Sequence, residues 1–216
     1  MSFPFPVITP SMAVPAVTQG TVLNQIVTTD GTGFAFSGLT SGITADAYPI
    51  LGIMARSGSV PDFVSVDVGG LACTQLYKQL NGTTVLAFYS APRGANGNVN
   101  VTFNVTMVRA ACCIIPLFNL KSRTTPTAVN TNSSDPMIAT IDCQVGGWIG
   151  GLAYNGSTSD SMTWTNLTEK FDVQPESVSC FSGACDVFAS AQTARSITAN
   201  PTNAGSGQLL IVMSLR

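Results

Sequence analysis

Histidine is absent from this chain of 216 residues, and glutamate occurs only at Glu169 and Glu176. Without an imidazole the chain cannot build a Ser-His-Asp or Cys-His nucleophilic site, a histidine metal site or histidine acid–base catalysis. The aspartates are scattered and mostly lie beside turn residues, where an Asp side chain commonly bonds its own backbone. They offer no convincing carboxylate pair for glycoside cleavage. We therefore predict a non-enzymatic protein with no catalytic residue and no cofactor.

Charge is also scarce, because only 9% of the residues are Asp, Glu, Lys or Arg and the formal net charge is −2. An ordinary soluble protein has about 25% charged residues. The chain has no cluster of Lys and Arg that could neutralise phosphates, which excludes a nucleic-acid partner. A nearly uncharged surface gives little repulsion between copies, and this favours a homo-oligomer. The alternative is that the low charge only reflects a β surface rich in Thr and Asn and says nothing about association between copies.

Long apolar runs are missing as well, since none approaches the roughly 18 residues that span a bilayer, and no membrane partner is expected. The first fifteen residues, MSFPFPVITPSMAVP, lack the positive charge of a signal peptide, so we expect synthesis in a cytoplasm without export by the general secretory route. Four prolines disfavour both a helix and a central strand, so residues 1–20 are predicted to form an extended arm. The arm would contact its own domain or a neighbouring subunit through Phe3, Phe5, Val7 and Ile8.

Apolar and polar residues alternate along most of the remaining chain, and Gly, Pro or Asn separates the alternating runs. This pattern predicts short antiparallel strands, whereas only residues 170–176 could form a short helical turn. Residues 119–136 are polar and are predicted to form a long connection. The predicted strands cover residues 22–28, 34–37, 48–56, 63–68, 71–79, 84–90, 99–107, 111–118, 137–145, 148–154, 161–164, 177–181, 186–194 and 208–215.

These strands predict an all-β fold, an antiparallel β-sandwich that is jelly-roll-like. The predicted domains are the arm, residues 1–20, and a single β-sandwich domain, residues 21–216. The tripeptide VGG occurs at residues 68–70 and again at residues 145–147. The sequences around the two copies do not match well, so no internal repeat is predicted.

Several motifs occur in a fixed order along the chain. They are ILGIMAR at residues 50–56, VDVGGLACT at 66–74, LAFYSAPRG at 86–94, GNVNVTF at 97–103, the polar loop 119–136 and a terminal strand at 208–215. Over roughly residues 45–216 this order resembles phage and prophage virion structural proteins with a jelly-roll-like β-sandwich. The Pro-rich arm replaces the plain first strand of the simplest members of that family.

The resemblance implies a bacteriophage virion structural protein, such as a capsid decoration, a head fibre or head-associated protein, or a tail component. Such a protein would be made in the host bacterial cytoplasm, would reside in the virion, and would bind copies of itself and other virion proteins. Jelly rolls also occur in lectins. The alternative function is therefore a carbohydrate-binding, lectin-like attachment module that recognises a bacterial surface glycan.

Aromatic residues are the remaining candidates for binding. Trp148, Tyr154 and Trp164 lie near the polar residues 155–160, and such rings could stack on a sugar or form an interface. The favoured interpretation is that they fill the core of the sandwich or a subunit interface.

The six cysteines allow two interpretations. Most fall in predicted strands, where a thiol behaves as a small apolar side chain. Cys180 and Cys185 enclose Phe-Ser-Gly-Ala, a turn-like composition, so they could form a disulfide across a hairpin. A cytoplasmic origin argues against this bond during assembly, whereas a released virion meets oxidising conditions. The spacing of these two residues is not that of a zinc site, and no metal site is predicted.

Overall fold

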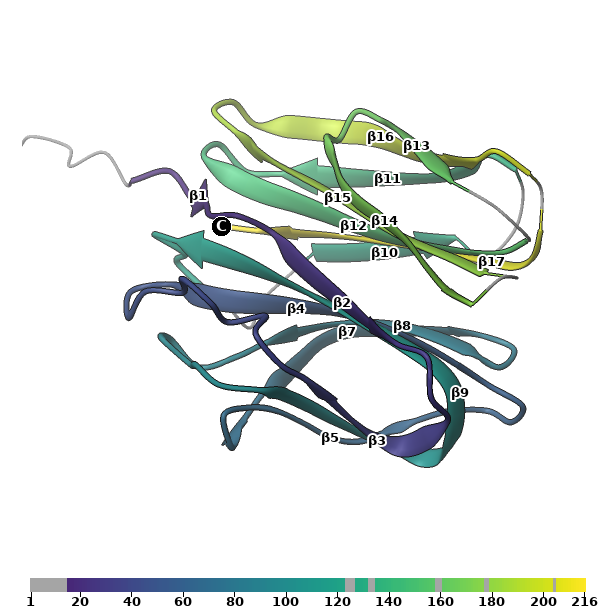
Figure 1. The fold of residues 1–216 in the computed structure, drawn as a ribbon. Coiled ribbons are helices and arrows are strands. Elements are labelled where there is room, and N and C mark those ends of the chain that lie inside the picture. Colours follow the sequence, from purple (N-terminus) through teal and green to yellow (C-terminus); the bar gives the residue numbers. More distant parts are fainter. Residues whose placement is uncertain (1–14, 123–126, 132–134, 158–160, 177–178, 204) are drawn as a thin grey trace, which may run out of the picture.

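The computed structural model describes residues 15–122, 127–131, 135–157, 161–176, 179–203 and 205–216 (Figure 1). These residues form antiparallel strands joined by turns, and none of the described residues belongs to a helix. The prediction of an all-β, antiparallel fold is therefore confirmed.

The first half of the chain forms one nine-stranded sheet. Its main path runs in the order β6-β5-β9-β4-β8-β7, and β1, β2 and β3 also pair with β9. The strands are β1 (Thr18–Gln19), β2 (Leu23–Val27), β3 (Gly31–Phe36), β4 (Tyr48–Ser57), β5 (Phe63–Val68), β6 (Leu71–Ala72), β7 (Thr74–Asn81), β8 (Thr84–Ser90) and β9 (Val99–Phe118).

The long strand β9 serves two groups of partners. Its first part pairs with β3 and β5, through residues such as Val101, and its second part pairs with β2 and β4, through residues such as Cys112. The ladder with β4 is irregular between Arg56 and Ser57, where the partners change. The sheet therefore curls, and it encloses a core of Phe34, Phe36, Leu51, Ile53, Val66, Val68, Val101 and Phe103, among others.

The second half of the chain forms two separate sheets, β10-β17-β12-β15-β14 and β11-β16-β13. Apolar residues from their facing sides form a core that includes Ile141, Ile149, Ala184, Ile197 and Val212. The strands are β10 (Thr127–Thr131), β11 (Met137–Cys143), β12 (Gly147–Gly156), β13 (Met162–Thr165), β14 (Glu169–Glu176), β15 (Ser179–Phe188), β16 (Gln192–Pro201) and β17 (Ser206–Leu215).

Both halves follow the same pairing scheme. The order β2-β9-β4-β8-β7 in the first half corresponds to β10-β17-β12-β15-β14 in the second, and β3-β9-β5 corresponds to β11-β16-β13. The two parts of β9 thus match β16 and β17. The VGG tripeptides are not equivalent in this scheme, because the first follows β5 and the second leads into β12. The two VGG tripeptides therefore do not mark this structural repeat.

The two halves pack against each other through their inner sheets, which are β2-β9-β4-β8-β7 in the first half and β10-β17-β12-β15-β14 in the second (Figure 1). On β4, Ile50 and Met54 point toward the second half, whereas Leu51 and Ile53 point into the curl of the first half. This shared core also contains Phe88, Cys113, Trp148, Leu152, Phe181 and Met213. Strand β14 contacts β2 and β9, and β17 contacts β7 and β8. The β14 side of the second inner sheet therefore lies over the β2 side of the first, and the β17 side lies over the β7 side. Because β14 corresponds to β7 in the shared pairing scheme, this arrangement is the one that an approximate two-fold axis would produce.

The structure corrects three sequence-based expectations about local structure. Residues 170–176 belong to strand β14 rather than to a helical turn, because Phe171 and Val173 pack into the shared core beside β15. The predicted connection 119–136 contains β10, which pairs with β17. Residues 17–19 of the predicted arm belong to the folded body, since Val17 is fully buried and β1 pairs with β9. The division into one arm and one domain remains a prediction.

Candidate functional site

Trp148 fills the core between the two inner sheets. Its side chain is 0% exposed, and its ring meets Phe88 edge to face at a centroid distance of 6.4 Å. The indole Nε1 donates a hydrogen bond to Gln19 Oε1 at 2.9 Å. The ring covers Gly150, where an added Cβ would lie 2.1 Å from a ring carbon. Trp148 therefore acts as a core residue that connects β12 to the start of the described chain.

Tyr154 and Trp164 do not join Trp148 in a binding surface. Tyr154 is buried in the same core as Trp148. Trp164 packs on the opposite side of β12, over Gly151, and its Nε1 donates to Ser182 Oγ at 2.8 Å. The sheet thus separates Trp164 from the other two aromatic residues. Both tryptophan rings cover glycines of β12, and the neighbouring W-I-G-G sequence is a signal for such packing.

Cys180 and Cys185 do not form the hairpin disulfide that is one of the two interpretations of their spacing. Both lie on the continuous strand β15, and they point to opposite sides, Cys180 into the core between the two sheets of the second half and Cys185 into the shared core. The intervening Gly183 is not a turn residue, because the ring of Phe171 packs over it. The expected turn therefore fails, and a disulfide between two such side chains is excluded by geometry.

Burial keeps most of the thiols unreactive. It raises the pKa of Cys112 and Cys113 well above the ordinary range, and it raises the pKa of Cys185 to about 12. A thiol of raised pKa is a poor nucleophile and a poor metal ligand because both roles need the thiolate. Cys73 differs from the other five cysteines because it is only partly buried.

The described chain starts beside the C-terminus. The Arg216 side chain donates hydrogen bonds of 3.0 Å to the carbonyl oxygens of Pro15 and Gly146. The Val17 amide also donates to Gly146 O, at 2.8 Å. Because Asn119, directly after β9, also donates to Ala16 O at 3.2 Å, both halves hold the root of the arm. The predicted arm contacts Phe3, Phe5, Val7 and Ile8 lie outside the described residues.

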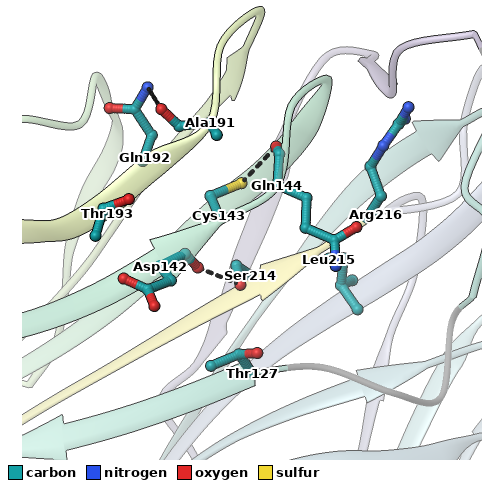
Figure 2. Close-up of a pocket in the computed structure, with 10 residues that line it drawn as sticks. All are labelled: Thr127, Asp142, Cys143, Gln144, Ala191, Gln192, Thr193, Ser214, Leu215 and Arg216. Atoms are coloured by element: carbon teal, nitrogen blue, oxygen red, sulfur yellow. Dashed lines mark hydrogen bonds between the residues drawn. The ribbon is translucent and has the colours of Figure 1, made fainter.

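A hollow of about 360 Å³ lies close to this root (Figure 2). Its polar groups mostly hold strands together, because Ser214 Oγ donates to Asp142 O and the Asp142 carboxylate accepts the Ala194 amide at 2.7 Å. Burial raises the pKa of Cys143, and Figure 2 shows the Arg216 side chain pointing away from the other sticks. The residues that line the hollow form no pair of a nucleophile and a base.

The described ranges contain no cluster of three or more His, Cys, Asp or Glu side chains that could hold a metal ion. None of the described residues belongs to a helix with the length and apolar character needed to cross a membrane. Comparison of the chain with family models, curated proteins and solved structures finds no match.

Proposed function

We propose that this chain is a non-enzymatic structural protein of a bacteriophage virion that assembles with copies of itself. The observation that carries the proposal is the strand order within each half. In the second half, β10 lies beside β17, β17 beside β12, and β12 beside β15, so the first of the eight strands pairs with the last, the last with the third, and the third with the sixth. In the other sheet β16 lies between β11 and β13, so the seventh strand pairs with the second and the fourth. We take this as the order of a jelly-roll sandwich, an architecture of viral capsid domains, although in the second half β14 pairs with β15 and not with β13.

Each half is thus proposed to be a jelly roll of its own, with the two stacked through their inner sheets. The fifth strand agrees with this assignment in the first half, where β6 pairs with β5 and the adjoining β7 pairs with β8. Aliphatic and aromatic side chains fill the cores of both halves. Such filled jelly rolls suit a structural role, and the motif order seen in the sequence supports a phage virion.

The outer surface of the second half also favours assembly. Most of its exposed residues on β11, β13 and β16 are uncharged, such as Thr140, Thr163, Thr165 and Ser196, and the exposed charged residue on these strands is Asp142. A surface of this kind offers hydrogen-bonding groups without the like-charge repulsion that keeps copies apart. The lectin alternative receives less support, because Trp148 and Tyr154 are buried and the sheet separates them from the partly buried Trp164, so the three rings form no common surface.

Removal of residues 1–14 tests the proposed assembly. The deletion stops before Pro15 because Val17 and Gln19 belong to the folded body. We expect the full chain to form an oligomer and the shortened chain to form smaller species with an unchanged midpoint of urea unfolding. Size-exclusion chromatography with light scattering measures both masses. A monomeric full chain, unaffected by the deletion, would contradict the proposal.

A further inference from the structure

The first half carries an uncharged groove between β5 and β7. Strand β6 pairs with β5 only at Ala72 and Leu71, and the chain then turns away so that β7 pairs with β8. The space left between β5 and β7 is a hollow of about 300 Å³. Its lining includes Phe63, Val64, Val66, Ala72, Cys73 and Tyr89, and no charged side chain lines it.

Both walls of the groove are irregular at the place where it opens. The ladder of β5 shifts register between Phe63 and Ser65, and that of β7 shifts between Gln75 and Tyr77. Such bulges bend strands and re-aim side chains, and they are frequent beside functional sites. Here the two register shifts lie where β5 and β7 diverge, and the edge of β5 that faces β7 borders the hollow.

The groove has an aromatic floor and an apolar rim. Phe63 and Tyr89 meet edge to face at a centroid distance of 5.2 Å, and Tyr89 donates to Gln75 Oε1 at 2.9 Å. Val64 is 65% exposed at the rim. Nearby, Lys78 and Asp62 form an ion pair of 2.7 Å, so these two charges neutralise each other. The groove therefore suits an apolar, uncharged segment of chain.

The N-terminal residues have this chemistry. The first charged side chain in the sequence is Asp30, and residues 3–8 read Phe-Pro-Phe-Pro-Val-Ile. Prolines lack the amide proton that a regular strand ladder needs, so this segment would not simply extend a sheet. Proline-rich segments instead bind aromatic-lined grooves in an extended conformation, with little loss of entropy.

We propose that residues 3–8 of one copy bind the groove between β5 and β7 of a second copy. Fourteen extended residues reach about 43 Å, at about 3.1 Å per residue, which is enough to contact a neighbour. The arm starts at Pro15, between the two halves, whereas β5 lies in the layer farthest from the second half (Figure 1). This inference rests on the proposed self-association and names the contact that produces it.

Disulfide trapping tests the contact. In the variant Phe5→Cys, a thiol oxidant is expected to join residue 5 to Cys73 of another copy, giving a covalent dimer on a denaturing gel. The other five cysteines are buried and should not compete. Cys73→Ser in the same chain should abolish the dimer, and Ser11→Cys in place of Phe5→Cys should give much less of it. A bond within one chain, or no bond at all, would overturn the proposed contact.

A charge placed in the groove gives an independent readout. Val64→Asp should lower the yield of the trapped dimer about tenfold or more, because an unpaired carboxylate is strongly disfavoured in an apolar contact. Val60→Asp is the matched control, since Val60 is 63% exposed in the same half but does not line the groove. Equal yields from the two variants would overturn the groove as the binding site. Oligomers that persist without any trapped dimer would leave the proposed function standing and reject this contact alone.

Discussion

Replacing Trp148 with alanine is expected to lower the free energy of unfolding by about 3–5 kcal/mol, the usual cost of removing a buried aromatic side chain. The indole is 0% exposed between the inner sheets, and its Nε1 bonds Gln19 on β1. The substitution therefore opens a cavity at the junction of the two halves and releases β1. Urea unfolding followed by circular dichroism measures the change.

Two further variants separate the contributions at this site. Trp148→Phe keeps an aromatic ring but removes the bond to Gln19, so its cost should be clearly smaller. Trp164→Ala should also cost less than Trp148→Ala, because Trp164 is only half-buried. A loss below about 1 kcal/mol for Trp148→Ala, typical of surface positions, would contradict the placement of this residue in the core.

Gly52→Val is expected to destabilise the protein by about 1–3 kcal/mol, because it overpacks a filled core. A Cβ at Gly52 would lie 2.7 Å from both Cys113 Sγ and Leu152 Cδ2. Gly52 is on the inner sheet of the first half, and Leu152 is on that of the second. The added side chain would thus push the two halves apart, and urea unfolding again measures the effect.

Gly33→Val is the matched control for this substitution. Gly33 also lies in a strand of the first half, but an added Cβ would have no atom within 4 Å. Gly52→Val should lower the free energy of unfolding less in a Leu152→Ala background than in the unchanged chain, because the two side chains compete for the same space. Strictly additive effects in this double-mutant cycle would contradict direct contact between the halves at Gly52.

The strands themselves could be predicted from the alternation of apolar and polar residues. The ranges predicted at 63–68 and 84–90 agree with β5 and β8 as observed. Alternation does not reveal edge strands where other sequence signals are stronger. Pro175 in β14 suggested the end of a helical turn, although an edge strand tolerates proline. The short polar strand β10 carries too little apolar character to differ from a loop.

The arrangement of the strands and the candidate site could not be predicted in the same way. Alternation shows that β4 has two apolar faces, but not that Ile50 meets the second half while Leu51 faces the curl. Trp148 and Tyr154 stand near polar residues in the sequence, which resembles a binding loop. Only their position in β12 shows that they face the shared core. The groove between β5 and β7 depends on two register shifts that have no clear sequence signal.

Electron microscopy of the purified full-length chain tests the proposed function most directly. The proposed role as a self-assembling virion protein predicts regular particles that each contain several copies of the chain. Each copy should show two stacked β units, in keeping with the inner sheets that pack face to face. A uniform field of single 22.4 kDa chains at every concentration tested would contradict it.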